Sequence, residues 1–450
     1  MFERSISHDL MEWKNSSNRK PLVLRGARQV GKTTIIHHFS KSFEQYIYLN
    51  LERNEDKFVF TNKQSINEMV DAIFFLKNKS RQIQDTLIFI DEIQEVPEAL
   101  AALRYFYEDY PQLYVIAAGS LLEMAFDNQI SYPVGRLEYK VLHPFSFEEF
   151  LLASGETMAL EQYNTIPIAS FAHEKMLQLF HLYTLIGGMP EVIKQYIEHR
   201  DLNALKSVYE SLLLSYIDDV EKYARNTTQT QIIRHAIRSC FSEAGSRIKF
   251  HGFGASSYAS REMGEALRTL EKTKLIYLIY PTTQTALPYQ PDIKKSPRLH
   301  LLDTGLVNYF AGVQKEVFSS HDLTDVYQGR ISEHIVGQEI LANNTNLLHT
   351  LLFWVRDKVD ASAEVDYLYV KDGIAIPVEV KSGKVGKLKS LFQFMETSNV
   401  NIAIRLYAGK FQTDQLRTTS GKPFILLNLP YYLAGNLDKY IEKYKYSHIY

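Results

Sequence analysis

Residues Gly26 to Thr33 carry the feature that most restricts how this chain folds: a glycine, four residues, a second glycine, a lysine and a threonine. The apolar run PLVLR precedes this segment, and a helical pattern begins at Lys32. Glycines let backbone N–H groups turn toward an anion, and the N-terminus of the following helix adds partial positive charge. A strand, a glycine-containing loop and a helix in this order predict a phosphate-binding loop.

Different residues of this loop are expected to contact different parts of a bound nucleotide. Lys32 is expected to reach the β- and γ-phosphates, and the Thr33 hydroxyl is expected to bind Mg²⁺. A chance Gly-Lys turn is the other interpretation, but the flanking strand and helix argue against it. The predicted nucleotide-binding residues are Gly26, Ala27, Arg28, Gln29, Val30, Gly31, Lys32, Thr33, Thr34 and Asp91.

A second motif follows further along the chain, where four apolar residues, LIFI, precede Asp91 and Glu92. Continuous apolar strands are typical of parallel sheets that are buried on both faces, and ligands bind beyond the carboxyl ends of such strands. Asp91 is expected to hold Mg²⁺, and Glu92 is expected to orient and deprotonate the attacking water. Glu92 could instead be a solvated acid at a strand end. Together the two motifs predict hydrolysis of ATP with Mg²⁺ as cofactor.

Two polar residues lie at or after the end of the next buried strand, LYVIAAGS. Ser120 ends this strand and is expected near the γ-phosphate if the strand lies between the two already described. Arg136 is expected to bring a guanidinium to the γ-phosphate from the same or a neighbouring subunit, since such an arginine neutralises charge on the transferred phosphoryl group. A neighbouring subunit would imply a homo-oligomer. The other interpretation is an ordinary surface arginine.

Pattern changes along the 450 residues predict four domains, because a chain of this length exceeds one hydrophobic core. Residues 1–150 alternate strands and helices, as in an open α/β sheet, and residues 151–225 are helical. Residues 226–328 combine short helices with a strand, and residues 329–450 return to an α/β pattern.

The composition indicates a globular protein of a reducing compartment. The formal net charge is −2, so contact with DNA or RNA needs a local basic patch. Cys240 is the single cysteine and cannot form an internal disulfide. The sequence has neither a signal-peptide pattern nor a run of ~18 apolar residues that would span a membrane. We expect a cytoplasmic protein that does not bind membranes.

Several segments carry a family resemblance. RGARQVGKTT, LIFIDEIQ, AAGS, the GR of PVGR, LHPFSFEEFL and YTLIGGMPEVI resemble the archaeal and bacterial AAA+ ATPases of the STAND-related branch, predicted ATPases with a C-terminal domain of unknown function. PFSFEEF and GGMPEV are the specific part of this resemblance, which covers nearly the whole chain. It implies an AAA+ core, a winged-helix-like middle domain and a small C-terminal α/β domain.

The middle segment SYASREMGEALRTLEKTKLIYLIYP resembles the recognition helix and wing of a winged-helix domain. Its basic residues are candidates for contact with nucleic-acid phosphates. The other interpretation is that this domain packs against the ATPase core and binds no DNA. The candidates are Arg261, Arg268, Lys272, Lys274, Lys294, Lys295 and Arg298.

The C-terminal segment contains a second set of chemically suited residues. Asp366 and Glu379 lie 13 residues apart on two expected strands joined by a Lys-Asp-Gly turn. Strand alternation puts Glu379 and Lys381 on one face. Asp366 and Glu379 are expected to bind Mg²⁺ or Mn²⁺, with Glu333 of the preceding helix as a further carboxylate. Lys381 is expected to orient water or stabilise charge on a phosphate.

This arrangement is similar to the restriction-endonuclease-like, PD-(D/E)xK, superfamily, although Val365 stands where the strict pattern has proline. The resemblance implies a metal-dependent nuclease, whereas a degenerate copy would only bind a partner. Two hypotheses follow. Either ATP turnover licenses a nuclease that acts on DNA or RNA, or nucleotide state controls assembly and the C-terminal domain is a binding platform.

Overall fold

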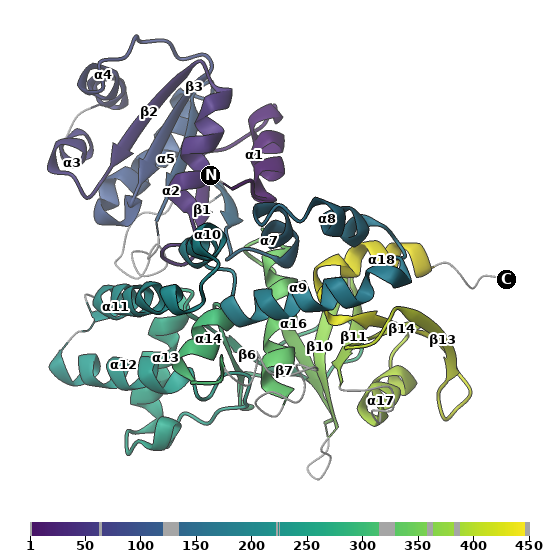
Figure 1. Ribbon diagram of the computed structural model, residues 1–450. Helices are drawn as coiled ribbons and strands as arrows, with labels where there is room; N and C mark the ends of the chain where they lie inside the picture. The colour runs from purple at the N-terminus through teal and green to yellow at the C-terminus, as the bar shows by residue number, and fades with distance from the viewer. Residues whose placement is uncertain are drawn as a thin grey trace. The chain divides into compact units, whose positions relative to one another are not determined.

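The computed structural model describes residues 2–62, 65–119, 135–221, 224, 226–314, 329–357, 363–381 and 388–445. Backbone contacts divide the chain into two compact units. Unit 1 comprises Met1–His143, Lys272–Lys274 and Asn344–Leu348, and unit 2 comprises Pro144–Glu271, Leu275–Asn343 and His349–Tyr450. Both units contain helices and strands, which confirms the predicted α/β class (Figure 1).

Unit 1 is built on a parallel five-stranded sheet in the order β2-β3-β4-β1-β5. Every residue of β3 is buried, as expected for a strand that is covered on both faces. The order also confirms the prediction that β4 lies between the strands of the two nucleotide motifs. The strands are β1 (Leu22–Arg25), β2 (Gln45–Asn50), β3 (Thr86–Asp91), β4 (Tyr114–Ala118) and β5 (Glu138–Val141).

Helices flank this sheet and bury one apolar face each. In α5 the buried residues Leu100, Leu103 and Phe106 recur at helical spacing and join the core formed with the strands. Pro97 is the first residue of α5, where its missing N–H group costs no hydrogen bond. The helices are α1 (Ile6–Asn15), α2 (Lys32–Phe39), α3 (Asn54–Thr61), α4 (Ile66–Leu76) and α5 (Pro97–Asp109).

Unit 2 begins with helices, as predicted for residues 151–225. Its later helices contact a mixed sheet, with α16 against β11 and α17 against β10 and β11. The helices are α7 (Phe147–Ala153), α8 (Thr157–Asn164), α9 (His173–Ile186), α10 (Pro190–His199), α11 (Lys206–Glu221), α12 (Thr227–Cys240), α13 (Ser260–Lys272), α14 (Thr304–Phe310), α16 (Arg330–Ala342), α17 (Lys389–Thr397) and α18 (Leu437–Tyr444). No helix in the described ranges is long and apolar enough to cross a membrane.

The sheet of unit 2 has seven strands in the order β13-β14-β12-β11-β10-β9-β7. The strands are β7 (Pro281–Thr282), β9 (Leu352–Val355), β10 (Glu364–Lys371), β11 (Ile374–Val380), β12 (Ile402–Tyr407), β13 (Gln412–Arg417) and β14 (Pro423–Pro430). β7 pairs with β9, so a domain boundary at residue 328 separates β7 from the sheet to which it belongs. An unpaired β9 edge would expose N–H and C=O groups, which β7 covers.

The strands β6 (Ile276–Ile279) and β8 (Arg298–Leu301) form a separate antiparallel pair that follows α13. A helix followed by a two-stranded ribbon is the order that the winged-helix resemblance predicts. The winged-helix assignment itself stays a prediction.

The GGMPEV segment lies in the core of unit 2, and its two glycines are required by close contacts. A Cβ atom on Gly187 would lie 2.2 Å from Asp303 Oδ1, and one on Gly188 would lie 2.4 Å from the Phe145 carbonyl oxygen. The Asp303 carboxylate accepts hydrogen bonds from the backbone N–H groups of Gly188 and, at 3.1 Å, Leu306. This carboxylate therefore fixes the turn between α9 and α10 against the start of α14.

The PFSFEEF segment is fixed by Glu339 of α16. The Glu339 carboxylate accepts hydrogen bonds from the Phe147 N–H at 3.0 Å and from the Tyr183 hydroxyl at 2.7 Å. Burial raises the pKa of Glu339 to about 8. PFSFEEF is thus held by α16, the helix that also carries Glu333, and GGMPEV is held by Asp303 at the start of α14.

Candidate active sites

The loop from Gly26 to Lys32 has the backbone that a phosphate-binding loop requires. Gly31 has φ 98° and Gly26 has φ 148°, both in the range that favours glycine. A Cβ atom on Gly26 would also lie 2.4 Å from the Leu142 carbonyl oxygen. The ammonium group of Lys32 is buried and donates to the carbonyl oxygens of Gly26 at 3.0 Å and Ala27 at 2.8 Å. Lys32 therefore points back over its own loop.

Thr33 and Asp91 meet at the carboxyl end of the sheet. The Thr33 hydroxyl donates to Asp91 Oδ2 at 2.8 Å, as the two motifs predict for neighbouring ligands of one cation. The Tyr48 hydroxyl donates to the same oxygen at 3.2 Å. Burial, and then the Asp91 carboxylate, raise the pKa of Tyr48. The sequence reasoning missed Tyr48, although the parallel register of β2 with β3 sets it opposite Phe89 and so near Asp91.

Glu92 follows Asp91 in a left-handed conformation, with φ 51° and ψ 44°. Residues other than glycine adopt this conformation at a cost on the order of 1 kcal/mol, and such residues concentrate at functional sites. Its carboxylate accepts a hydrogen bond from Gln94 Nε2 at 2.6 Å. Burial raises the pKa of Glu92, and the opposing effects of Gln94 and then Lys32 are smaller. Glu92 is therefore close enough to Lys32 to interact with it.

The remaining predicted loop residues are Ala27, Arg28, Gln29, Val30 and Thr34. Val30 is fully buried and anchors the loop, whereas Gln29 is exposed and has φ 62°. Thr34 is exposed at the start of α2. Ser120 lies outside the described residues, so the structure does not locate it.

Arg136 lies at the opposite end of the parallel strands from the phosphate loop. It precedes β5, where Glu138 pairs with Leu22 at the start of β1, whereas the loop follows Arg25 at the end of β1. The Arg136 guanidinium forms an ion pair with Glu108 of α5. The structure therefore does not bring Arg136 to the nucleotide motifs of its own subunit. Its action on a neighbouring subunit stays a prediction.

Comparison with known sequences agrees with this geometry. Residues 18–151 match the profile of the AAA domain. Unit 1 therefore contains an AAA-type P-loop ATPase domain. Within this AAA domain, the profile covers the phosphate loop, Asp91 and Glu92, and all five strands of the sheet.

The rest of the chain matches two profiles without assigned function. Residues 177–317 match a domain of unknown function (DUF8612), and residues 328–429 match another (DUF4143). No curated protein matches the chain at a significant level. These profiles give unit 2 no chemistry beyond what its own residues suggest.

Two solved structures are similar to parts of this chain. A Walker-type ATPase of Pyrococcus abyssi has 16% identity and a TM-score of 0.43, over 69% of this chain and 96% of that chain. A RuvB variant of Thermotoga maritima has 12% identity and a TM-score of 0.26, over 61% of this chain and 86% of that chain. Because both TM-scores are low, the AAA assignment depends on the profile match and the loop geometry.

The predicted acidic residues of unit 2 lie near one another, as their electrostatic interactions indicate. Asp366 Oδ2 accepts a hydrogen bond from the Val380 N–H at 2.8 Å, which ties β10 to the end of β11. Glu379 Oε1 lies 3.0 Å from Lys381 Nζ, while the buried Glu379 Oε2 has no hydrogen-bond partner. Burial and then Asp366 raise the pKa of Glu333 to about 7 and that of Glu379 to about 8.

Arg298 changes the role that was expected of Glu333. Its guanidinium lies 3.3 Å from Glu333 Oε2 and 3.8 Å from Asp366 Oδ1, and it also pairs with Glu364. Across the described ranges, no three Asp, Glu, His or Cys side chains are grouped so that they could hold a metal ion. Glu333 was expected to be a metal ligand together with Asp366 and Glu379. In this arrangement the Glu333 carboxylate instead forms an ion pair with Arg298.

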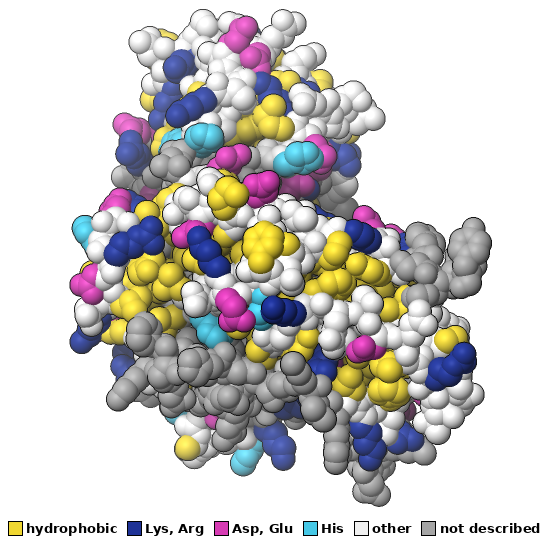
Figure 2. All heavy atoms as spheres, turned by 45° about the vertical axis from the view of Figure 1, so that its right-hand side comes forward, with side chains coloured by type: hydrophobic (Ala, Val, Ile, Leu, Met, Phe, Trp, Pro, Cys, Tyr) yellow, Lys and Arg dark blue, Asp and Glu magenta, His cyan; other side chains and the backbone are white. Residues whose placement is uncertain are grey.

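The same contacts correct the prediction that Arg298 binds nucleic-acid phosphate, since its side chain is only 5% exposed. On α13 the exposed face carries Arg261, Glu262, Glu265 and Arg268, two residues of each sign. The face drawn in Figure 2 likewise shows Lys and Arg side chains dispersed among acidic, polar and hydrophobic ones. The mixed charge of the α13 face therefore does not support a phosphate-binding stripe on this helix.

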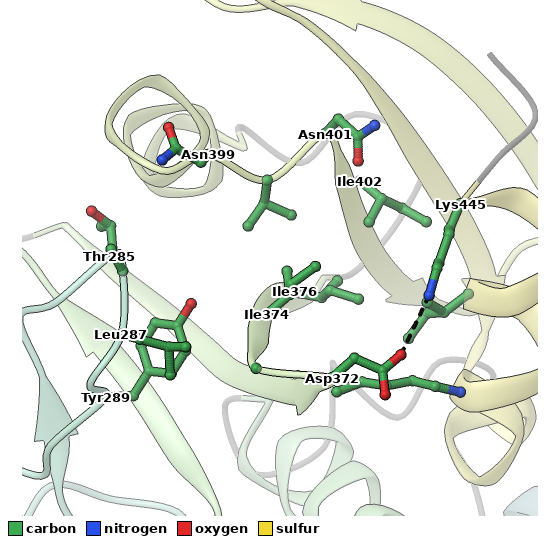
Figure 3. A pocket seen from close by; sticks show the side chains of 15 residues that line it. Thr285, Leu287, Tyr289, Asp372, Ile374, Ile376, Asn399, Asn401, Ile402 and Lys445 are labelled. Atoms are coloured by element: carbon green, nitrogen blue, oxygen red, sulfur yellow. Dashed lines mark hydrogen bonds and ion pairs between the residues drawn. The ribbon is translucent and has the colours of Figure 1, made fainter. Parts of the chain in front are cut away.

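A cavity of about 570 Å³ lies at the opposite end of the β10–β11 hairpin from Asp366 and Glu379 (Figure 3). Figure 3 shows Leu287, Ile376 and Ile402 around its interior. The charged residues that line it are paired, Lys445 with Asp372 at 3.3 Å and Lys371 with two acids of α18. None of the predicted site residues lines this cavity.

Proposed function

We propose that the AAA domain binds MgATP between its phosphate loop and the end of β3, and hydrolyses it. The observation that carries this proposal is the 2.8 Å contact between the Thr33 hydroxyl and Asp91 Oδ2. A hydroxyl and a carboxylate are oxygen ligands of the kind that Mg²⁺ takes beside a nucleotide. The residues present therefore fit the cation, which would neutralise charge on the phosphates.

The side chains of this site have distinct roles in the proposed reaction. Lys32 donates to phosphate oxygens in place of the two loop carbonyls that it now contacts. Glu92 accepts a proton from the attacking water, and Gln94 holds the Glu92 carboxylate in place. Burial raises the pKa of Glu92 above its ordinary value. As the pH is lowered, the rate of ATP hydrolysis should therefore begin to fall at a higher pH than it would with an ordinary glutamate as the base.

For unit 2, the proposed function is hydrolysis of nucleic-acid phosphodiesters with one divalent cation, Mg²⁺ or Mn²⁺, at Asp366 and Glu379. The buried and unpartnered Glu379 Oε2 supports this proposal, since a buried carboxylate oxygen without a partner is costly. The raised pKa of Glu379 has the same origin, because burial and Asp366 both disfavour its charge. A cation would relieve this repulsion and leave Lys381 to contact a phosphate.

The second candidate function is a switch controlled by nucleotide, in which unit 2 binds a partner without catalysis. The 3.0 Å ion pair between Lys381 and Glu379 favours it, because a lysine engaged with the acid is not offered to a substrate. The balanced charge of the α13 face also favours it. Asp366 stays close to both residues, which favours the nuclease proposal.

Cleavage of plasmid and single-stranded DNA in Mg²⁺ or Mn²⁺ separates the two functions. The nuclease proposal predicts metal-dependent cleavage that falls by on the order of 100-fold in Lys381→Ala and in Asp366→Asn. Lys389→Ala is the matched control, because Lys389 is an exposed lysine at the start of α17 and should leave the rate unchanged. Absence of cleavage, with or without ATP, would leave the binding platform as the better account.

A further inference from the structure

Arg298 is a buried cation beside the acidic residues of unit 2, with a side chain that is only 5% exposed. We propose that Arg298 is a built-in cation that stands in for a second divalent ion, so that the cluster accepts a single metal ion at Asp366 and Glu379. This inference rests on the proposed metal site of unit 2. Arg298 is then a positioning residue that acts through Asp366.

The contacts of Arg298 are those of a cation held among ligands. Its guanidinium contacts the carboxylates of Glu333, Glu364 and Asp366, and its Nη1 donates to the Asp366 carbonyl oxygen at 3.1 Å. Arginine presents five donors in a fixed planar fork and stays charged in proteins. One side chain can therefore serve several oxygen acceptors at once, as a metal ion does.

The position of the guanidinium explains which carboxylates stay available for a metal. Glu333 and Asp366 both interact with Arg298, at 3.3 Å and 3.8 Å. In two-metal sites the two ions lie about 4 Å apart, and in our proposal the guanidinium takes the place of one of these ions between Glu333 and Asp366. Here the shared cation is Arg298, which leaves the pair Asp366 and Glu379 to take an ion.

Arg298 comes from β8, outside the segment from residue 329 that carries the acids. β8 pairs with β6 in the ribbon that follows α13, and β7 of the same region pairs with β9 of the sheet. The middle segment therefore contributes a residue to the metal site as well as a strand to the sheet. This explains why the acids of the site can be buried together in unit 2.

The test is the number of Mn²⁺ ions bound per full-length chain, measured by calorimetry and electron paramagnetic resonance without nucleotide. All proteins carry Thr33→Ala and Asp91→Asn, which silence the AAA site. We expect one Mn²⁺ in this background, with the spectrum of isolated ions, and its loss in Glu379→Gln. Arg298→Gln should bind two Mn²⁺ with a spin-coupled spectrum, because Glu333 and Asp366 lose their shared cation.

Two further variants keep the test informative if Arg298→Gln does not fold. Arg298→Gln combined with Glu364→Gln removes one charge of each sign, and it should fold and also bind two Mn²⁺. Arg247→Gln is the matched control, because Arg247 contacts Glu364 at 3.4 Å from a more exposed position, and it should bind one. The background protein tests the inference even if every Arg298 variant unfolds, since two coupled ions there would contradict it.

The outcomes distinguish the inference from the function on which it rests. No Mn²⁺ binding that depends on Glu379 would overturn the proposed metal site. One Mn²⁺ in the background protein, and one of equal affinity in both Arg298 variants, would overturn the role of Arg298 while the metal site stands.

Discussion

The guanidinium of Arg136 lies at the amino end of the parallel strands, whereas the phosphate loop follows their carboxyl end. The ion pair with Arg136 is the main reason that the pKa of Glu108 is lowered. Both side chains are partly exposed, so this pair adds little to stability. We propose that this partly exposed arginine acts on the nucleotide of another copy of the chain.

Mixing two inactive proteins tests this role of Arg136. Lys32→Ala lacks the phosphate contact, and Arg136→Ala lacks the guanidinium, so each subunit can supply what the other lacks. We expect the mixture to recover part of the ATP turnover that both variants lose alone. An active species that is strictly monomeric, with no recovery at any mixing ratio, would show that Arg136 is a surface residue.

At the scale of residues, the spacing within two sequence motifs predicted the nucleotide-binding residues, but it did not predict the residues that hold them in place. Lys32, Thr33 and Asp91 follow from two short motifs whose strand and helix context fixes their geometry. Arg4 was not predictable, although it donates to the Val30 carbonyl oxygen at 3.2 Å. Arg298 did carry a signal, because a charged residue in the strand RLHL, which is otherwise apolar except for one histidine, requires a buried partner.

Among the elements, α16 joins the core of unit 2 to its acidic cluster. Glu333 lies in its first turn, and Glu339 lies two turns later against Phe147 and Tyr183. The Glu339 carboxyl group is fully buried, and its Oε2 has no hydrogen-bond partner. The folded state therefore favours the protonated form of this group.

This preference is one contribution to the pH dependence of the stability of unit 2, beside those of Glu333 and Glu379. Because the folded-state pKa of Glu339 is about 8, above its ordinary 4.5, its contribution is present at low pH and is lost as the pH rises through 8. Glu339→Gln should flatten this dependence and raise the free energy of unfolding at about pH 8.5 by on the order of 2 kcal/mol.

Urea unfolding at about pH 5 and about pH 8.5 measures this effect. The two proteins should have similar stability at the lower pH, where Glu339 is already protonated. Glu174→Gln, an exposed acid in the first turn of α9, is the control and should follow the wild type. An equal pH dependence in Glu339→Gln and wild type would show that Glu339 is not the titrating group.

Elements were easier to predict than their pairing. The strands of the acidic segment were expected from apolar runs and a Lys-Asp-Gly turn, and β10 and β11 pair as an antiparallel hairpin. The two-residue strand β7 was not expected, because so short a segment has no alternation pattern, and its pairing with β9 depends on tertiary contacts.

For the whole chain, the two units predict which fragments can fold. A fragment from residue 329 onward lacks β7 and Arg298, so the β9 edge is open and Glu333 and Asp366 lose a cation. We expect a fragment from residue 144 onward to unfold cooperatively, and one from residue 329 to lack a cooperative transition. Thermal unfolding followed by circular dichroism measures both. A cooperative transition in the shorter fragment would show that its acids need no help from β8.

In the proposed reaction Glu92 is the base that activates water, and ATP binding does not depend on it. The most direct measurement is ATP affinity together with the rate of phosphate release in wild type, Lys32→Ala and Glu92→Gln. Lys32→Ala should lose binding, whereas Glu92→Gln should bind ATP as the wild type does and release phosphate at least 100-fold more slowly, on the order expected for loss of a general base. Phosphate release by Glu92→Gln at the wild-type rate would contradict this account.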